Sequence, residues 1–136
     1  MKKNSTCKNR SMYEAKKFEV LEVRKQTDDN YLYVLDCDIN PAPGQFVEVS
    51  IAGLGEAPIS TASNNDKKLE LNVRTVGNIT KAMTHLRPGD KLSIRGPYGF
   101  GFPMEQFKGN NLVLIGGGCG AAPLKGVIEY IDNNRE

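Results

Sequence analysis

The chain has 136 residues, of which 39% are hydrophobic and 25% charged, and its formal net charge is +2. This length suits one compact domain and is too short for two complete ones. The composition is that of a folded protein and excludes a disordered or fibrous one. Basic residues are concentrated near the start without interleaved aromatic residues, which indicates a solvated segment rather than a nucleic-acid surface.

The number and spacing of cysteine and histidine residues, and the hydropathy of the chain, argue against disulfide-rich, metal-binding, membrane-spanning and secreted proteins. Cys7, Cys37 and Cys119 are odd in number and far apart, so neither a disulfide framework nor a paired-cysteine metal site is predicted. His85 is the only histidine, and we predict no metal ligands and no catalytic acid or base. No apolar run reaches the roughly 20 residues that span a bilayer, and the start lacks the apolar segment of a secretory signal. We therefore expect a cytoplasmic protein that binds neither membranes nor nucleic acid.

Short stretches that alternate apolar and polar residues follow the polar start, which is the pattern of β-strands. The predicted strands cover residues 18–24, 31–37, 46–51, 68–76 and 90–96, with an extended stretch over residues 55–63. In the fourth strand one face is buried and the polar face is open to a ligand. Residues 79–86 have helical spacing, and Pro88 and Gly89 end this short helix. Close strands with one helix favour an antiparallel barrel.

The end of the chain has a different pattern. Residues 112–115 are an apolar run without alternation, typical of a strand buried on both faces, and residues 124–131 form an amphipathic helix. This βα unit cannot cover both sides of its own strand, so we expect its exposed apolar face to pack against the barrel or to drive dimerisation. The predicted organisation is a polar flexible start (1–12), a β-barrel (13–107) and the start of an incomplete nucleotide-binding domain (108–136).

The final turn, "GGGCGAAP" over residues 116–123, has three features that phosphate binding requires. Its glycines let the backbone approach an anion, the next helix directs free N–H groups and its positive dipole end at that anion, and Pro123 suits the first helical turn. A tight strand-to-helix turn does not by itself need three glycines in a row, so we favour a phosphate site. Cys119 in this turn is interpreted as a packed or incidental cysteine.

The second signal, around Gly77, is weaker. In "VGNIT", Gly77 precedes a helix whose backbone N–H groups could receive a pyrophosphate, with the Thr80 hydroxyl as an extra donor; alternatively Asn78 is only a helix cap. Arg74, three residues before Gly77, is either a fixed cation for a phosphate or a solvated arginine.

"GEAPISTAS", over residues 55–63, is the third signal. Pro58 disfavours a helix before it, and Ser60, Thr61 and Ser63 offer hydroxyls beside the small apolar Ile59. A polar edge strand would show the same pattern, so this stretch gains meaning only together with the others.

In this order, five blocks of the sequence resemble the ferredoxin-NADP reductase superfamily of flavoproteins: "PGQFVEVS", "EAPIST", "VRTVGNITKAM", "LRPGDKLSIRGPYGFGF" and "VLIGGGCGAAPL". The likeness is strongest to flavin subunits that accompany a partner enzyme: that of anaerobic sulfite reductase, the gamma subunit of sulfhydrogenases and the electron-transfer subunit of dihydroorotate dehydrogenase. It implies a mainly-β fold, a six-stranded antiparallel Greek-key barrel of the FAD-binding type with one short helix. The first βα unit of an α/β nucleotide-binding domain would follow.

The resemblance also implies which residues bind cofactors. The family's Arg-x-Tyr-Ser motif falls on residues 57–60, where only Ser60 matches, so Ile59 would replace the stacking tyrosine and Arg74 the arginine. Ser60 and Thr61 would contact the reactive edge of the flavin ring. The stretch after Gly77 would meet the FAD pyrophosphate, and the final glycine turn that of NAD(P)H. The implied cofactor-binding residues are Pro58, Ile59, Ser60, Thr61, Asn72, Val73, Arg74, Gly77, Asn78, Ile79, Thr80, Gly116, Gly117, Gly118, Cys119 and Gly120.

By the same resemblance, electrons would pass from NAD(P)H through FAD to an iron–sulfur centre and a catalytic partner subunit, and the flavin would supply the chemistry. The rest of the nucleotide domain and the segment that holds a 2Fe–2S cluster would lie beyond Glu136, so we expect a truncated chain that is inactive alone. The sequence favours neither FAD over FMN nor NADH over NADPH. Two alternatives stay open: a non-catalytic barrel module that holds a flavin or docks on a partner, and a barrel that has lost its ligand.

Overall fold

The computed structural model describes residues 11–63 and 65–135. Its strands are β1 (Lys16–Lys25), β2 (Asn30–Asp36), β3 (Phe46–Ile51), β4 (Gly55–Ser60), β5 (Lys68–Arg74) and β6 (Lys91–Tyr98). Its helical segments are α1 (Asn78–Met83), α2 (Met104–Phe107), the 3-10 turn η1 (Gly118–Gly120) and α3 (Ala121–Asn133). No helix among the described residues is both long and apolar enough to cross a membrane.

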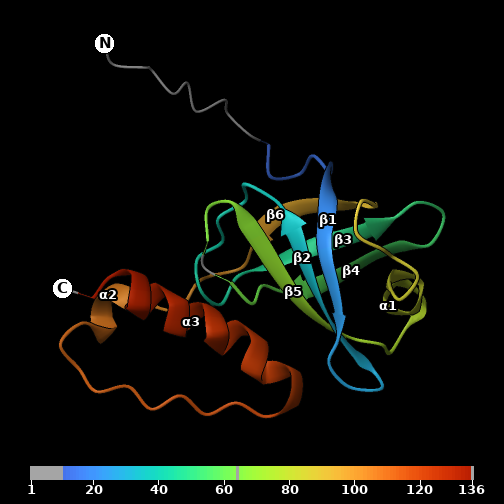
Figure 1. The fold of residues 1–136 in the computed structure, drawn as a ribbon. Coiled ribbons are helices and arrows are strands. Elements are labelled where there is room, and N and C mark those ends of the chain that lie inside the picture. The colour runs from blue at the N-terminus through green and yellow to red at the C-terminus, as the bar shows by residue number, and fades with distance from the viewer. Residues whose placement is uncertain (1–10, 64, 136) are drawn as a thin grey trace.

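The six strands form one antiparallel sheet in the order β4-β3-β6-β1-β2-β5. The sheet curls until its edge strands approach each other, and Thr61, directly after β4, bridges Leu71 in β5. Beside this bridge the N–H of Ala62 donates to the carbonyl of Glu70 at 2.8 Å. The mainly-β antiparallel barrel predicted from the sequence is confirmed (Figure 1).

Alternation along the strands fills the barrel interior. In β5, Leu69, Leu71 and Val73 are at most 2% exposed and point inward, and the residues between them point outward. The helix α1 adds Met83, which is fully buried in the same core. Each such side chain contributes roughly 1.5–3 kcal/mol when it leaves water. The core therefore fixes which β5 side chains face outward.

Residues 1–10, which include Cys7 and most of the predicted flexible start, lie outside the described residues. Met12 is held against the barrel, because its carbonyl accepts hydrogen bonds from the N–H of Gly96 and from the hydroxyl of Tyr98.

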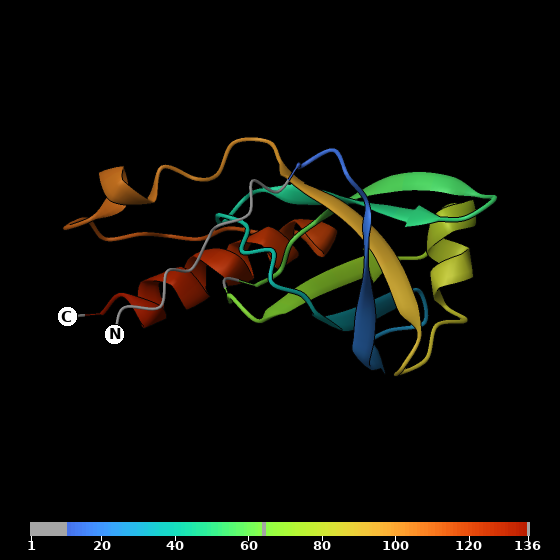
Figure 2. The ribbon, with the colours of Figure 1, turned by 90° about the horizontal axis from the view of Figure 1, so that it is seen from above.

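The predicted strand over residues 112–115 is wrong. These residues are extended but unpaired, and Val113 and Ile115 are 83% and 89% exposed. A strand needs a neighbour for its backbone hydrogen bonds, and no described strand lies beside this segment, which runs along the outside of the molecule (Figure 2). The amphipathic helix that follows is formed, as α3.

The helix α3 packs on the outside of the barrel. Val127 is 1% exposed, and Gly126 lies against the loop that carries Ser63, since a Cβ added there would be in ordinary contact with the Ser63 carbonyl at 3.6 Å. Ile128 is 56% exposed on the outer side. The packing leaves the first turn of α3 facing the outer surface of the barrel.

Candidate functional site

The predicted cofactor-binding stretches converge at one part of the barrel. The edge strands β4 and β5 lie beside each other, α1 packs against β4, and the turn η1 lies against β5. Figure 1 shows the end of β5 between α1 and the first turn of α3. Four stretches that are far apart in sequence are therefore neighbours.

The β4 stretch contributes side chains of different orientation. Pro58 and Ser60 are exposed, and Ile59 is half-buried and packs partly against the core. Thr61 is 1% exposed, and its hydroxyl donates to the carbonyl of Gln45 at 3.0 Å. Ser60 is thus free to meet a ligand through its side chain, whereas Thr61 is buried and both its hydroxyl and its N–H donate to the carbonyl of Gln45.

The β5 stretch presents two polar side chains. Asn72 and Arg74 point outward, and Val73 between them is buried. The Asn72 side chain donates to Gln26 Oε1 at 2.5 Å, and Arg74 Nε donates to Asp29 Oδ2 at 2.8 Å. The Arg74 guanidinium holds the pKa of the Asp29 carboxyl below its usual value. Gln26 and Asp29 were not predicted, because a contact between a hairpin and a distant strand leaves no local pattern.

The stretch before α1 is an intact helix cap. The Thr80 hydroxyl accepts from the N–H groups of Val76 and Gly77, both at 2.9 Å, and donates to the Gly77 carbonyl at 3.1 Å. It is therefore committed to the backbone, and the sequence-based role of Thr80 as an extra phosphate donor loses its free hydroxyl. Ile79 is 9% exposed, so it offers a ligand only backbone. A Cβ on Gly77 would meet nothing within 4 Å, so the space before this turn is open.

The glycines of the final turn differ in role. A Cβ on Gly116 would lie 2.8 Å from Leu124 Cδ1 and 3.1 Å from Ala121 Cα, so this glycine is required by the packing of α3. Gly117, Gly118 and Gly120 face open space, and Gly118 has φ of +55°. The exposed Cys119 lies near enough to Arg74 to raise the pKa of that guanidinium, after the larger effect of Asp29. The turn and the end of β5 therefore face each other.

A cavity of about 400 Å³ lies between the outer face of the barrel and α3, and Asn72 is the one predicted cofactor-binding residue that lines it. Leu32 and Val34 line it together with Asn72, and the first turn of α3 contributes Ala121 and Ala122. The side-chain oxygen of Asn72 is buried there without a hydrogen-bond partner among the described residues. An unsatisfied buried acceptor is costly to the fold.

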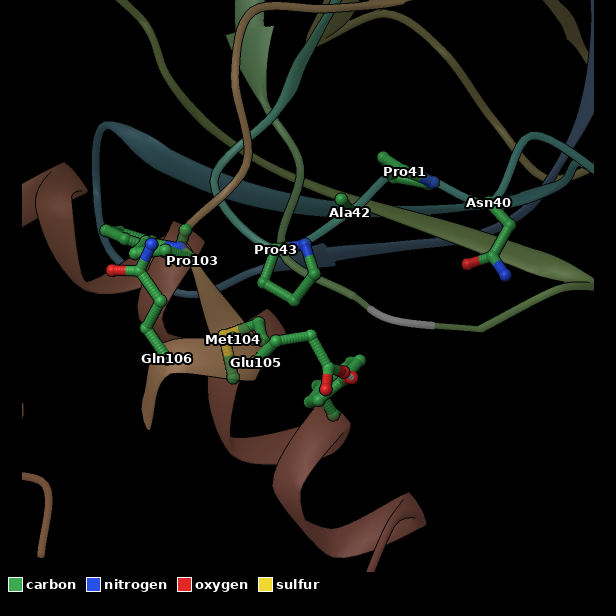
Figure 3. Close-up of a pocket in the computed structure, with 10 residues that line it drawn as sticks. Asn40, Pro41, Ala42, Pro43, Pro103, Met104, Glu105 and Gln106 are labelled. Atoms are coloured by element: carbon green, nitrogen blue, oxygen red, sulfur yellow. Dashed lines mark hydrogen bonds between the residues drawn. The ribbon is translucent and has the colours of Figure 1, made fainter. Parts of the chain in front are cut away.

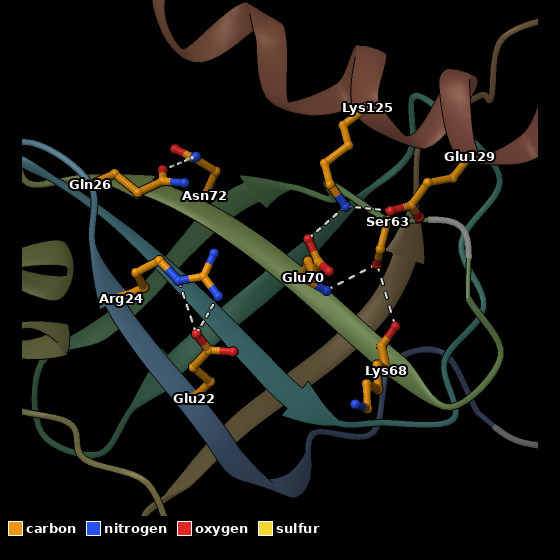
Figure 4. A network of polar contacts seen from close by, with 9 residues as sticks. All are labelled: Glu22, Arg24, Gln26, Ser63, Lys68, Glu70, Asn72, Lys125 and Glu129. Carbon is orange, nitrogen blue, oxygen red and sulfur yellow. Dashed lines mark hydrogen bonds and ion pairs between the residues drawn. The ribbon is translucent and has the colours of Figure 1, made fainter.

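An ion-pair cluster holds α3 over this cavity (Figure 4). Lys125 of α3 donates to Glu70 of β5 at 2.8 Å and also pairs with Glu129. Burial acts to lower the pKa of Lys125, but the hydrogen bonds to the two carboxylates outweigh burial and raise it. Lys125 therefore stays charged at neutral pH.

A larger hollow of about 520 Å³ lies elsewhere (Figure 3). The loop over residues 40–43 faces α2 and Tyr130 across it, and the Tyr130 hydroxyl donates to Glu105 at 3.2 Å. It contains none of the predicted cofactor-binding residues.

No protein-family model matches the chain. It is 43% identical to the gamma subunit of sulfhydrogenase 2 from Pyrococcus furiosus over 129 residues, which are 90% of this chain and 45% of the relative. It is 34% identical to a probable electron-transfer subunit of dihydroorotate dehydrogenase B from Methanopyrus kandleri over 119 residues, which are 86% of this chain and 44% of the relative. The chain thus spans less than half the length of these curated relatives.

Solved structures give the same result for the fold. A cytochrome P450 reductase of Amycolatopsis superposes with a TM-score of 0.72 at 31% identity, over 88% of this chain and 40% of that one. A ferredoxin-NADP+ reductase from Neisseria gonorrhoeae, solved with bound FAD and NADP, superposes with a TM-score of 0.73 at 22% identity, over 85% of this chain and 50% of that one. The resemblance predicted from the five sequence blocks is confirmed.

Proposed function

Because this chain has the fold of ferredoxin-NADP reductase-like proteins, we propose that it is the flavin-binding barrel of an NAD(P)H-dependent electron-transfer oxidoreductase. The observation that carries the proposal is the convergence of β4, β5, α1 and η1, which brings the exposed Ser60, the cation of Arg74 and the glycine turn to one part of the barrel surface. In this reading residues 13–107 form the flavin domain and residues 108–136 begin the nucleotide domain.

Each part of this site has a chemical role. Ser60, exposed at the end of β4, would donate its hydroxyl to the polar edge of the flavin ring. Arg74 would neutralise part of the FAD pyrophosphate, and the open backbone beyond Gly77 lets that group approach closely. The glycine turn would receive the pyrophosphate of the nicotinamide nucleotide at the start of α3.

The donor and acceptor set fits a flavin. FAD has phosphate oxygens that can accept from Arg74, and a ring edge with polar atoms that the exposed Ser60 hydroxyl can meet. When bound, the flavin supplies the redox chemistry, and the chain supplies orientation and charge.

We extend this proposal to the whole protein through its relatives. The sulfhydrogenase and dihydroorotate dehydrogenase relatives are named as subunits, so this chain would deliver electrons to a catalytic partner subunit. NAD(P)H would be the donor, and a 2Fe–2S cluster held outside this chain would carry electrons onward. The exposed apolar side chains of Val113, Ile115 and Ile128 would be covered by the remaining nucleotide-domain sheet, and in its absence by a second copy of the chain.

The test is a titration of the purified chain with FAD, followed in the visible flavin band and by calorimetry. The proposal predicts a saturable complex with one FAD per chain, and weaker binding by an Arg74→Ala variant. A chain that binds FAD but is not reduced by NADH would be the flavin-binding part alone. A flavin spectrum that does not change at saturating FAD would overturn the proposal.

A further inference from the structure

The hairpin between β1 and β2 contacts two outward-facing polar side chains of β5, Asn72 and Arg74, which are among the predicted cofactor-binding residues. Gln26 Oε1 accepts from Asn72 Nδ2 at 2.5 Å, as Figure 4 shows, and Asp29 Oδ2 accepts from Arg74 Nε at 2.8 Å. Neither hairpin residue is among those that the resemblance implies. The hairpin therefore contacts the proposed flavin site through two separate side chains.

Asp29 is itself held in place from several directions. Its Oδ1 accepts from the Thr27 hydroxyl at 3.0 Å, and its Oδ2 accepts from Arg74. Its backbone carbonyl accepts from the N–H of Thr75 at 2.7 Å, which ties the hairpin to the end of β5. The carboxylate therefore has a fixed position relative to the strand that carries Arg74.

This ion pair has little value for stability. The side chains of Arg74 and Asp29 are 59% and 49% exposed, and exposed pairs add little to the free energy of folding. Its effect is on orientation. The contact uses only Nε of the guanidinium, and the structure shows no hydrogen bond of its two terminal nitrogens to any described residue. Those nitrogens stay available to an anion.

We propose that Asp29 is a positioning residue that orients Arg74 toward the phosphate of the bound flavin nucleotide, which rests on the proposed function. An arginine that is already oriented loses less side-chain freedom when it binds a phosphate. Asp29 also has an opposing effect, because its negative charge weakens the attraction of Arg74 for an anion. The two effects can be separated because asparagine keeps the hydrogen-bond acceptor and removes the charge.

The experiment compares two variants of equal charge, Asp29→Asn and Asp29→Ala, in the full chain. Their dissociation constants for FAD, FMN and riboflavin are measured by calorimetry. Asparagine can still accept from Arg74 Nε, so Asp29→Asn should bind FAD roughly two- to fivefold more tightly than Asp29→Ala, the range expected for one exposed charged contact. Riboflavin has no phosphate, so the two variants should bind it equally.

Asp28 provides a matched control, because it lies in the same hairpin and pairs with Lys25 instead of Arg74. The variants Asp28→Asn and Asp28→Ala should bind FAD equally. Equal FAD affinity of Asp29→Asn and Asp29→Ala would overturn the positioning role while leaving the flavin site intact. A difference between these two variants that is as large for riboflavin as for FAD would also overturn it, since the hairpin would then act on the whole site. Failure of the unmodified chain to bind FAD would instead reject the proposed function itself.

Discussion

The hydroxyl of Tyr33 is buried in the barrel without a hydrogen-bond partner among the described residues. The whole Tyr33 side chain is buried, and burial raises its pKa to about 12. The ring fills core volume, and the unsatisfied hydroxyl opposes folding. Tyr33 is therefore a packing residue.

We expect Tyr33→Phe to stabilise the chain by about 1 kcal/mol, because the ring is kept and an unsatisfied hydroxyl is removed. Urea unfolding of both proteins measures the difference. A loss of stability would show that the hydroxyl is satisfied by a buried water, contrary to this interpretation.

Gly116 and Gly117 are adjacent but differ in whether the packing of α3 requires a glycine. An added Cβ on Gly116 would collide with Leu124 and Ala121, whereas one on Gly117 would meet nothing within 4 Å. Gly116→Ala should therefore destabilise the chain by about 1–3 kcal/mol, the usual cost of overpacking. Gly117→Ala should leave the thermal midpoint nearly unchanged. Equal thermal midpoints for the two variants would contradict the packing role of Gly116.

At the scale of elements, three strands are joined outside the barrel by one carboxylate. Glu56 of β4 accepts from Arg95 of β6 at 2.5 Å and from the Ser50 hydroxyl of β3 at 2.6 Å. The hydrogen bond from Arg95 is the main reason why the pKa of Glu56 is lowered from 4.5 to about 2. A carboxyl group whose pKa is lowered in the folded state stabilises the fold at pH values above its ordinary, unfolded-state pKa. This stabilisation is lost as the pH falls through the folded-state pKa.

We therefore expect the thermal midpoint of the unmodified chain to exceed that of Glu56→Gln at neutral pH. The difference should shrink as the pH falls from 4.5 toward 2, where Glu56 takes up its proton. Thermal unfolding of both proteins across this range measures it, with Glu22→Gln, on the exposed pair with Arg24, as the control. A difference that does not change with pH would contradict the assigned cause.

The docking of α3 on the barrel depends on Lys125. Lys125→Ala should increase amide hydrogen exchange in α3, because Glu70 of β5 loses its partner, while the strands keep their protection. Arg135→Ala is the matched control, since within residues 11–63 and 65–135 Arg135 pairs only with Asp132 at the same exposed end of α3. Similar exchange in both variants would mean that apolar contacts such as Val127 hold the helix.

Local sequence patterns predicted those strands and helices that are determined by residues close together in the sequence. Alternation placed the strands, and Pro88 with Gly89 marked the end of the region of α1, although the helix itself ends at Met83. The run over residues 112–115 misled, because an apolar run predicts a buried strand, whereas these residues are largely exposed and no described strand pairs with them. Asp29 and Gln26 could not be predicted, since they reach β5 only after the barrel closes. The hydroxyl of Thr80 was predicted to face a ligand, and it caps the backbone instead.

On the scale of the whole molecule, the barrel and the glycine turn before α3 lie together and would form one side of the proposed nucleotide site. The closed sheet provides rigid strand ends, α1 and η1 flank them, and α3 holds the glycine turn beside Arg74. This arrangement places the two proposed pyrophosphate-binding turns near one cation. Sequence order alone, with more than 35 residues between Gly77 and Gly116, gives no such proximity.

The most direct test is a crystal structure of the chain saturated with FAD. The account predicts electron density for the flavin along the facing edges of β4 and β5, with the ring beside Ser60 and the pyrophosphate within hydrogen-bond distance of Arg74 and the backbone after Gly77. FAD bound at a different surface, or a site that stays empty of nucleotide at full saturation, would contradict it.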